Sequence, residues 1–180
     1  IQTLNLMNNP MKTNTSYMVK FGGILGGVSV IFALILFTLD MHYGQEPLVN
    51  YVNYAISIGV IVLGIYTFRR DNEGFLSLSQ AIKLGLGISL ISAIIALVYT
   101  GLLMNVIEPT YMETVSELTK SKIIDENPEM TQEQLNAALD MMEKFQGFGV
   151  IAGFILIFSL FFGFLTSLVA GLILKKARPE

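Results

Sequence analysis

The side chains best suited to chemistry are those of Asp40 and His42, which follow the first long apolar segment of the chain. A carboxylate beside an imidazole can relay a proton or supply two ligands to a metal ion. His42 is the only histidine and there is no cysteine, so a multi-histidine or thiolate metal site within one chain is excluded. Two such residues in one short loop are also typical of a polar membrane interface, and we favour that simpler interpretation.

Other patterns that carry chemistry are missing from the sequence. No GxSxG, HExxH, Walker A or GxGxxG motif occurs in the context that its chemistry needs. Hydroxyl groups in a membrane helix most often bond their own backbone or a neighbouring helix. We therefore expect a protein that is not an enzyme and has no catalytic, cofactor-binding or metal site. The polar side chains within the long apolar segments are those of Asn53, Ser57, Ser89, Ser92, Tyr99, Thr100, Ser159, Thr166 and Ser167.

The composition explains where these residues lie. Of 180 residues, 53% are apolar and only 14% are charged, whereas soluble domains carry about 25% charged residues. This composition excludes a disordered chain, which needs low hydrophobicity and high charge. The net charge of −3 excludes a general nucleic-acid binder.

Four segments contain no Asp, Glu, Lys, Arg or His and are long enough to cross a bilayer, which takes about 20 apolar residues. We predict an all-α membrane protein with four transmembrane helices, flanked by an N-terminal segment (1–20) and a tail (175–180). Met11-Lys12 has the features of a natural start, which would make the first ten residues a polar leader. The predicted spans are residues 21–39, 49–68, 84–104 and 150–174.

The charges between these spans are distributed unevenly. Two basic residues precede the first span, three lie between the second and third, and three follow the fourth. Only Lys120, Lys122 and Lys144 lie on the other side, together with eleven of the fourteen acidic residues. Because basic residues collect on the cytoplasmic side, we predict an inner (plasma) membrane protein with both termini cytoplasmic and an acidic, periplasmic loop 105–146.

That loop carries two helical patterns of its own. Tyr111, Val115 and Leu118 share one helix face, and the Asn127-Pro128 pair ends the pattern. Thr131 then begins a second helix with a capping box, and the apolar stripe of this helix consists of Leu135, Leu139, Met142 and Phe145. We predict an extracytoplasmic helical hairpin. Its acidity fits a solvated face, and the alternative is a surface for cations or a basic partner.

Glycines mark the first span. Gly22 and Gly26, and likewise Gly23 and Gly27, form two GxxxG pairs on neighbouring faces. Glycine lets helix backbones approach closely, which drives helix association in lipid. Packing within one chain and contact with a second copy or another membrane protein both remain open.

The segment between the second and third spans repeats Phe75, Leu78 and Ile82 at helical spacing. We predict an interfacial amphipathic helix over 74–83, in which Lys83 extends to the headgroups. Phe75, Gln80 and Lys83 of this segment, and Leu139 of the hairpin, are the interface candidates.

Three patterns give the chain a family resemblance. They are Lys20-Phe21-Gly22 with Gly26, the run Gly74…Ser77…Gln80-Ala81-Ile82-Lys83…Gly85, and Met130-Thr131-Gln132-Glu133-Gln134. With these the chain resembles domain of unknown function 4199, a family of four-helix membrane proteins found mainly in Bacteroidota, over Met11 to Lys176. The resemblance implies an inner-membrane protein with no established activity and no functional residues to transfer.

Two function classes follow. The first is a non-enzymatic membrane module or subunit whose outer hairpin meets a partner, with the lipid bilayer as its surroundings. The second is a small oligomeric transporter or channel, since four helices enclose little space unless several protomers combine or a gap is lined by Asn53, Ser89 and Ser92.

Overall fold

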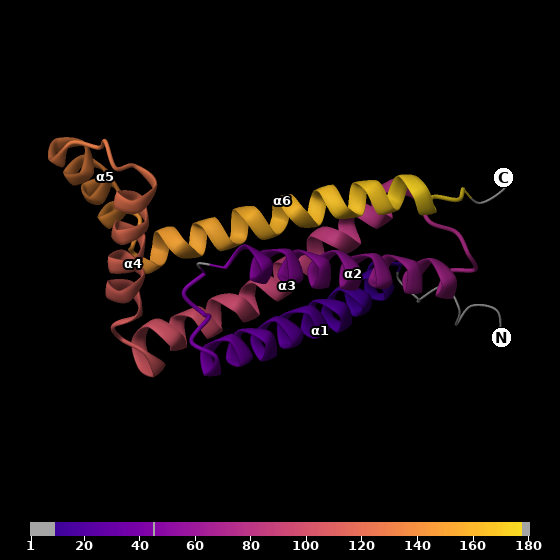
Figure 1. Cartoon of the computed structure of the whole chain (residues 1–180). Coiled ribbons are helices and arrows are strands. Elements are labelled where there is room, and N and C mark those ends of the chain that lie inside the picture. The colour runs from indigo at the N-terminus through magenta and orange to yellow at the C-terminus, as the bar shows by residue number, and fades with distance from the viewer. Residues whose placement is uncertain (1–9, 45, 178–180) are drawn as a thin grey trace, which may run out of the picture.

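The structure is a computed structural model that describes residues 10–44 and 46–177. Residues 1–9 of the predicted polar leader and residues 178–180 of the predicted tail lie outside the described part. Within it the chain is helical, and an isolated β-bridge is the only β pairing there (Figure 1). The elements in order are α1 (Pro10–Thr38), α2 (Pro47–Asp71), α3 (Leu78–Leu102), the π-helical turn η2 (Leu103–Ile107), α4 (Tyr111–Glu126), α5 (Gln132–Lys144) and α6 (Phe148–Leu174).

Four of these helices are long and apolar enough to cross a membrane, as the sequence predicts. Several extend beyond the uncharged segments, because a helix satisfies its own backbone hydrogen bonds and continues into polar flanks. The start of α1 and the end of α6 lie at the same end of the bundle (Figure 1). The candidate spans are Asn14–Thr38, Pro47–Asp71, Leu78–Ile107, which includes the π turn, and Phe148–Leu174.

The prediction of a separate interfacial helix over 74–83 is wrong, because the second half of this segment is the start of α3. Helix α3 begins at Leu78 because Ser77 caps it: the Ser77 hydroxyl accepts the backbone N–H of Gln80. The Gln80 side chain in turn accepts the backbone N–H of Ser77, which completes a capping box. The helical spacing of Phe75 and Leu78 therefore spans a turn and a helix start.

The chain before this cap is a tight turn. Glu73 and Gly74 have positive φ values of 58° and 81°, which glycine adopts without strain. The next residues join the end of α6: Leu76 and Lys176 exchange backbone hydrogen bonds of 3.0 and 2.9 Å. This bridge fixes the start of α3 beside the end of α6.

Helix α3 is the centre of the bundle and packs against α6 through facing small residues. Ala81 faces Gly171, Gly85 faces Ser167, and Ser89 faces Gly163, so the two helices are antiparallel. A methyl group added at Gly85 would lie 2.9 Å from the backbone carbonyl oxygen of Gly163. Such small-xxx-small rows allow close backbone approach, which provides van der Waals contact where lipid removes the hydrophobic driving force.

The opposite side of α3 carries α1, which runs parallel to it. A Cβ at Gly22 would lie 2.7 Å from Cβ of Ile91, and one at Gly26 would lie 2.5 Å from Cδ1 of Ile95. Gly23 and Gly27, on the neighbouring face, have no atom within 4 Å of such a Cβ. One of the two GxxxG pairs is therefore used within the chain, and the other faces outward.

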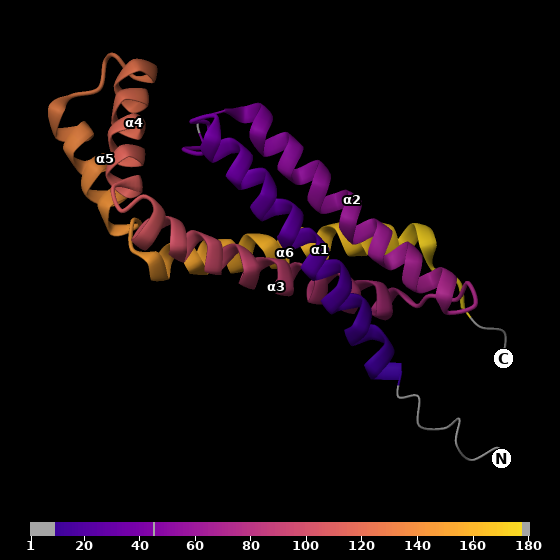
Figure 2. The same ribbon diagram turned by 90° about the horizontal axis from the view of Figure 1, so that it is seen from below.

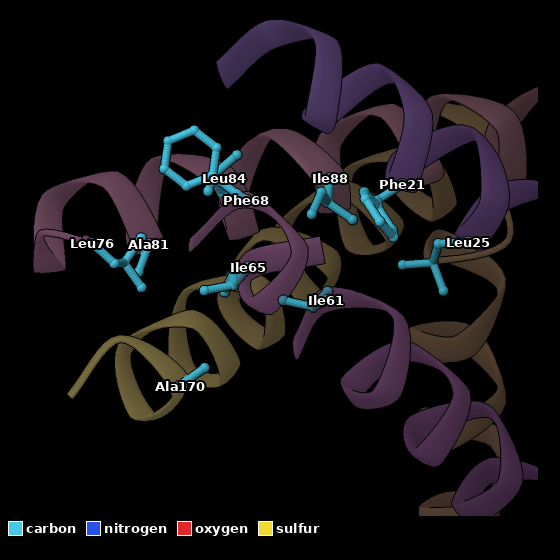
Figure 3. Packing of buried hydrophobic residues seen from close by; sticks show 10 residues of the cluster. All are labelled: Phe21, Leu25, Ile61, Ile65, Phe68, Leu76, Ala81, Leu84, Ile88 and Ala170. Carbon is cyan, nitrogen blue, oxygen red and sulfur yellow. The ribbon is translucent and has the colours of Figure 1, made fainter. Parts of the chain in front are cut away.

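Buried apolar side chains concentrate in the half of the bundle that contains the start of α3. Phe21, Ile61, Ile65 and Ile88 are among the most buried, and Figure 3 shows them converging from α1, α2 and α3. Towards the other end, α1 and α2 diverge from α3 and α6 (Figure 2). At that end the divergent helices need other contacts to hold them.

Helices α4 and α5 form the predicted hairpin between α3 and α6 and lie across the end of the bundle (Figure 1). Thr131 caps α5, with the Thr131 side chain accepting the N–H of Gln134 and the Gln134 side chain accepting the N–H of Thr131. Leu135 is the buried residue of α5, and Leu139 is half-buried. The first residue of the predicted stripe, Leu135, is therefore buried, whereas the last, Phe145, is 49% exposed.

The two glycine faces of α1 give a matched pair of variants. We expect Gly26→Ile to lower the stability of the bundle by about 1–3 kcal/mol, because the added side chain overlaps Ile95 in a packed seam. Gly27→Ile, one residue further on, adds the same atoms to an open face and is expected to leave stability unchanged or slightly raised, since glycine is a poor helix former. Thermal unfolding in detergent measures both.

An equal loss of stability in Gly26→Ile and Gly27→Ile would contradict this packing of α1 against α3. A changed oligomeric state in Gly27→Ile alone would show that the outward glycine face contacts a second copy.

Candidate functional site

The site begins with the reversal of the chain after α1. The Met41 N–H bonds the carbonyl of Leu36 at 2.9 Å and the Asp40 N–H bonds that of Phe37 at 3.2 Å, which is the Schellman pattern of a helix end. Asp40 takes the left-handed position with φ 55°, which aspartate tolerates better than most residues. This turn leaves Asp40 exposed and directs His42 back towards the bundle.

The partner of His42 is Glu108, 66 residues away, and not Asp40. The Nε2 atom of His42 lies 2.8 Å from Oε2 of Glu108, and the hydroxyl of Tyr43 donates to Oε1 of the same carboxylate at 2.7 Å. The His42 side chain is 6% exposed and that of Glu108 18%. This bond joins the α1–α2 loop to the end of α3, and we call the three residues His42, Tyr43 and Glu108 the latch.

The π turn places Glu108 for this bond. The Glu108 N–H reaches back five residues to the carbonyl of Leu103 at 2.8 Å, and the Asn105 side chain donates to the carbonyl of Gly101 at 2.8 Å. Pro109 follows at once and cannot continue the hydrogen-bonded ladder. Such π turns are rare and occur frequently at functional sites.

Aromatic rings enclose the His42 imidazole. The ring centroids of Phe37, Tyr43 and Tyr111 lie 4.8, 4.1 and 6.0 Å from it. The Tyr111 hydroxyl also donates a long hydrogen bond, 3.4 Å, to the backbone carbonyl of His42. Helix α4 thus covers the latch from the hairpin side.

The latch changes the acidity of its members. The Tyr43 hydroxyl, and then His42, hold the pKa of Glu108 below its ordinary value, while partial burial opposes them. The same hydrogen bond raises the pKa of Tyr43, because losing its proton would place an anion beside the carboxylate. Burial raises the pKa of Tyr111. Glu108 is therefore ionised at neutral pH and only accepts hydrogen bonds.

One ring nitrogen of His42 has no hydrogen-bond partner in the described residues. Because an ionised Glu108 must receive a proton, Nε2 of His42 carries the hydrogen of that bond. The other ring nitrogen, Nδ1, is buried and makes no hydrogen bond within the described residues. A buried polar atom without a partner costs about 1–3 kcal/mol, so the position is unusual.

Chemically, the latch can hold or pass one proton between imidazole and carboxylate. For a metal ion it offers His42 and Glu108, and no group of three or more His, Asp or Glu side chains comes together in the described part of the chain. The sequence contained one usable signal for Glu108: it follows the third span directly, at the same end of the bundle as the loop after the first span.

The other predicted interface residues lie elsewhere. Phe75 is half-buried, with the Lys176 ammonium 5.5 Å from its ring centroid, and Gln80 is engaged in the cap of α3. Lys83 is exposed on α3. Leu139 lies in the hairpin, so the structure does not gather these four residues into one surface.

The four membrane-length helices and a latch at one end define a multi-pass helical membrane protein. The chain belongs to the family described as Protein of unknown function (DUF4199), whose model matches residues 20–176. The family resemblance of the sequence is thereby confirmed. No curated protein and no solved structure matches the chain.

We expect the latch to weaken in acid. A carboxylate whose pKa is lowered by folding contributes stability above its unfolded pKa, near 4.3, and loses it as the pH falls through the folded pKa. At about pH 6 the Tm of the parent should therefore be higher than that of Glu108→Gln. This difference in Tm should become smaller as the pH falls towards about 3. Thermal unfolding of both across this range measures the gap.

Glu117→Gln, which removes an exposed carboxylate of α4, is the matched control and should show no such narrowing. A gap between parent and Glu108→Gln that stays constant with pH would contradict the assigned role of the carboxylate.

Proposed function

We propose that the chain is a non-enzymatic module of the inner (plasma) membrane whose hairpin, α4–α5, contacts a partner protein outside the lipid. The observation that carries this proposal is the apolar surface of the hairpin. Met141 on α5 is 63% exposed and Ile124 on α4 is 44% exposed, although the hairpin is otherwise acidic and lies outside the four spans. Exposed apolar groups rimmed by charge are typical of protein interaction sites.

Both termini are cytoplasmic in this proposal, and the hairpin lies on the far side. Basic residues flank the ends of the spans near the termini, in accordance with the positive-inside rule. The start of α1 and the end of α6 lie at one end of the bundle, which an even number of crossings requires (Figure 1). The eleven acidic residues of the two opposite loops support the same orientation.

Reporter fusions test the orientation. An alkaline phosphatase reporter, which is active only in the periplasm, should be active when fused near Pro128 and inactive when fused near Asn72. We expect this result because the basic residues near the ends of the spans set the orientation in which the chain is inserted. Reversed activities would overturn the orientation without affecting the fold.

A native pull-down in mild detergent tests the partner surface. We expect Met141→Glu to lose a membrane-protein partner that the parent retains, because a charge there must be desolvated in the contact. Gln132→Glu adds the same charge at an exposed position in the first turn of α5 and should retain the partner. The same set of co-purified proteins in all three samples would contradict the proposal.

An oligomeric transporter or channel is the second candidate. The structure does not place Ser89 and Ser92 beside Asn53 on an open gap: both serines are buried, Ser89 against Gly163 of α6, whereas Asn53 is exposed on α2. A different polar groove favours this candidate: a cavity of about 190 Å³ between α2 and α6 is lined in part by Asn53, Ser57, Ser159 and Thr166. Proton or ion flux in liposomes that Asn53→Leu abolishes would favour it over the module.

A further inference from the structure

A groove of about 420 Å³ lies between α2 and α6. Ile58 and Val62 belong to its α2 wall, and Val169 and Ile173 to its α6 wall. Its described lining residues are apolar except for Thr166. Both helices have the length and hydropathy of a membrane span, and Val169 and Ile173 are 57% and 76% exposed. The groove is therefore open on the side that meets lipid.

Basic residues follow the walls of this groove at one end. Helices α2 and α6 run in the same direction (Figure 1). Eleven residues separate Ile58 from Arg69, which is about three turns of helix, so Arg69 lies on the same face of α2 as the groove wall. On α6, Leu174 lines the groove and is followed directly by Lys175 and Lys176. The two walls therefore end in positive charge at the same end of the bundle.

The turn between α2 and α3 holds these charges near one another. The Nε atom of Arg69 donates to the carbonyl of Gly74 at 3.1 Å. Two residues further on, Leu76 exchanges backbone hydrogen bonds with Lys176. The Lys176 ammonium lies 5.5 Å from the ring centroid of Phe75, between those two residues. The end of α6 is thus fixed beside the end of α2.

The acidic residues of this turn do not balance the positive charge. Asp71 accepts hydrogen bonds from Arg70 and Tyr17, so its charge is matched by that of Arg70. Glu73 is the other acid of the turn, and it is outnumbered by the three basic residues at the end of the groove. Lys175 and Lys176 are exposed. This end of the groove therefore suits an anion.

We propose that the groove binds an anionic phospholipid, with one acyl chain between α2 and α6 and the headgroup at Arg69, Lys175 and Lys176. The distance from Ile58 to Arg69 along the helix is about 16 Å, which is about half of a hydrocarbon core about 30 Å thick. The groove therefore has the depth of one leaflet, and its charge lies where the headgroups begin. Basic pockets between membrane helices are typical sites for anionic headgroups.

A second copy of the chain suits this groove less well than a lipid does. Copies inserted in the same orientation place their basic ends at the same interface of the membrane. Any helix of the second copy in this groove would then bring its own basic end beside Arg69 and Lys175, and like charges repel. The inference goes beyond the proposed function, because it depends neither on the side of the hairpin nor on its partner.

Quenching by brominated lipid tests the binding. The chain contains no tryptophan, so Ile173→Trp places a single fluorophore at the exposed rim of the groove. The full chain is reconstituted into vesicles that mix dibrominated phosphatidylcholine, which quenches tryptophan, with unlabelled phosphatidylglycerol. Relief of quenching gives the binding constant of phosphatidylglycerol relative to phosphatidylcholine. We expect a ratio of about 5, the effect of about one basic residue near an anionic lipid.

Leu63→Trp is the matched control on another face of α2. Leu63 is 54% exposed and is not among the lining residues of the groove. It lies about two turns before Arg70 on the same helix face, and Nε of Arg70 is 2.9 Å from the carboxylate of Asp71. Because that basic residue is already paired, we expect a ratio near one at this position.

Further changes in the Ile173→Trp protein separate the headgroup site from the groove. Replacing both Lys175 and Lys176 with Gln removes two charges but keeps the backbone bridge to Leu76, and should bring the ratio towards one. Replacing both Lys20 and Lys83, which are exposed on α1 and α3, removes the same charge outside the groove and should leave the ratio unchanged. Val62→Phe fills the groove and keeps every basic residue, and should also bring the ratio towards one.

Three results would overturn the proposal. The first is a ratio near one in Ile173→Trp. The second is the same ratio in Ile173→Trp and Leu63→Trp, which would mean that anionic lipid collects around this end of the bundle without a site. The third is a ratio that survives either Val62→Phe or the loss of Lys175 and Lys176. Because both lysines are exposed, their replacement decides the matter even if Val62→Phe fails to fold.

Discussion

The close approach of α3 to its neighbours is the constraint on which the rest of the structure depends. In lipid, apolar side chains gain little by leaving their surroundings, so helices associate through packing of small residues. Helix α3 has such contacts on both sides: Gly85 against α6, and Ile91 and Ile95 against the glycines of α1. Because these seams are narrow, only a limited set of side chains fits them, and the relative positions of α1, α3 and α6 follow.

The same constraint creates the problem that the latch solves. Helices that meet closely near one end and cross at an angle separate at the other, as α1 and α3 do in Figure 2. The separated end cannot be filled by the core cluster, which lies in the other half. A charge-assisted hydrogen bond between His42 and Glu108 therefore joins the two pairs of helices there, and a cavity of about 390 Å³ lies beside it.

The sequence specified much of this fold in advance. Uninterrupted apolar runs predicted the four long helices, and the capping box at Thr131 and the Asn127-Pro128 break predicted the hairpin, because these signals are local. The apolar spacing after Gly74 predicts a separate helix over 74–83, although Ser77 and Gln80 carry the same capping signal as Thr131 and Gln134. These capping residues are enough to predict that a helix starts at Leu78, but the apolar spacing favours an earlier start.

The candidate site was only half visible. The sequence points to His42 and suggests its neighbour Asp40 as the partner, whereas in the structure Asp40 is exposed and His42 bonds Glu108. The bond to Glu108 spans 66 residues and depends on how α1 crosses α3, which no local pattern encodes. The same holds for the glycines: the sequence predicted two equal faces, and the register against Ile91 and Ile95 decides which of them is covered.

The π turn has a consequence for how this part of the chain tolerates changes in length. In an α-helix each residue advances the chain by about 100° around the axis, and a π turn closes one turn with one residue more than an α turn. Removing one residue from Leu103–Ile107 would therefore restore an α-helical ladder and leave the direction of everything beyond it nearly unchanged. Removing one residue from the α-helical part of α3 would instead rotate Glu108 by about 100° away from His42 and turn α4 and α5 with it. The π turn is thus a place where this helix can lose a residue and still keep the latch and the hairpin in position.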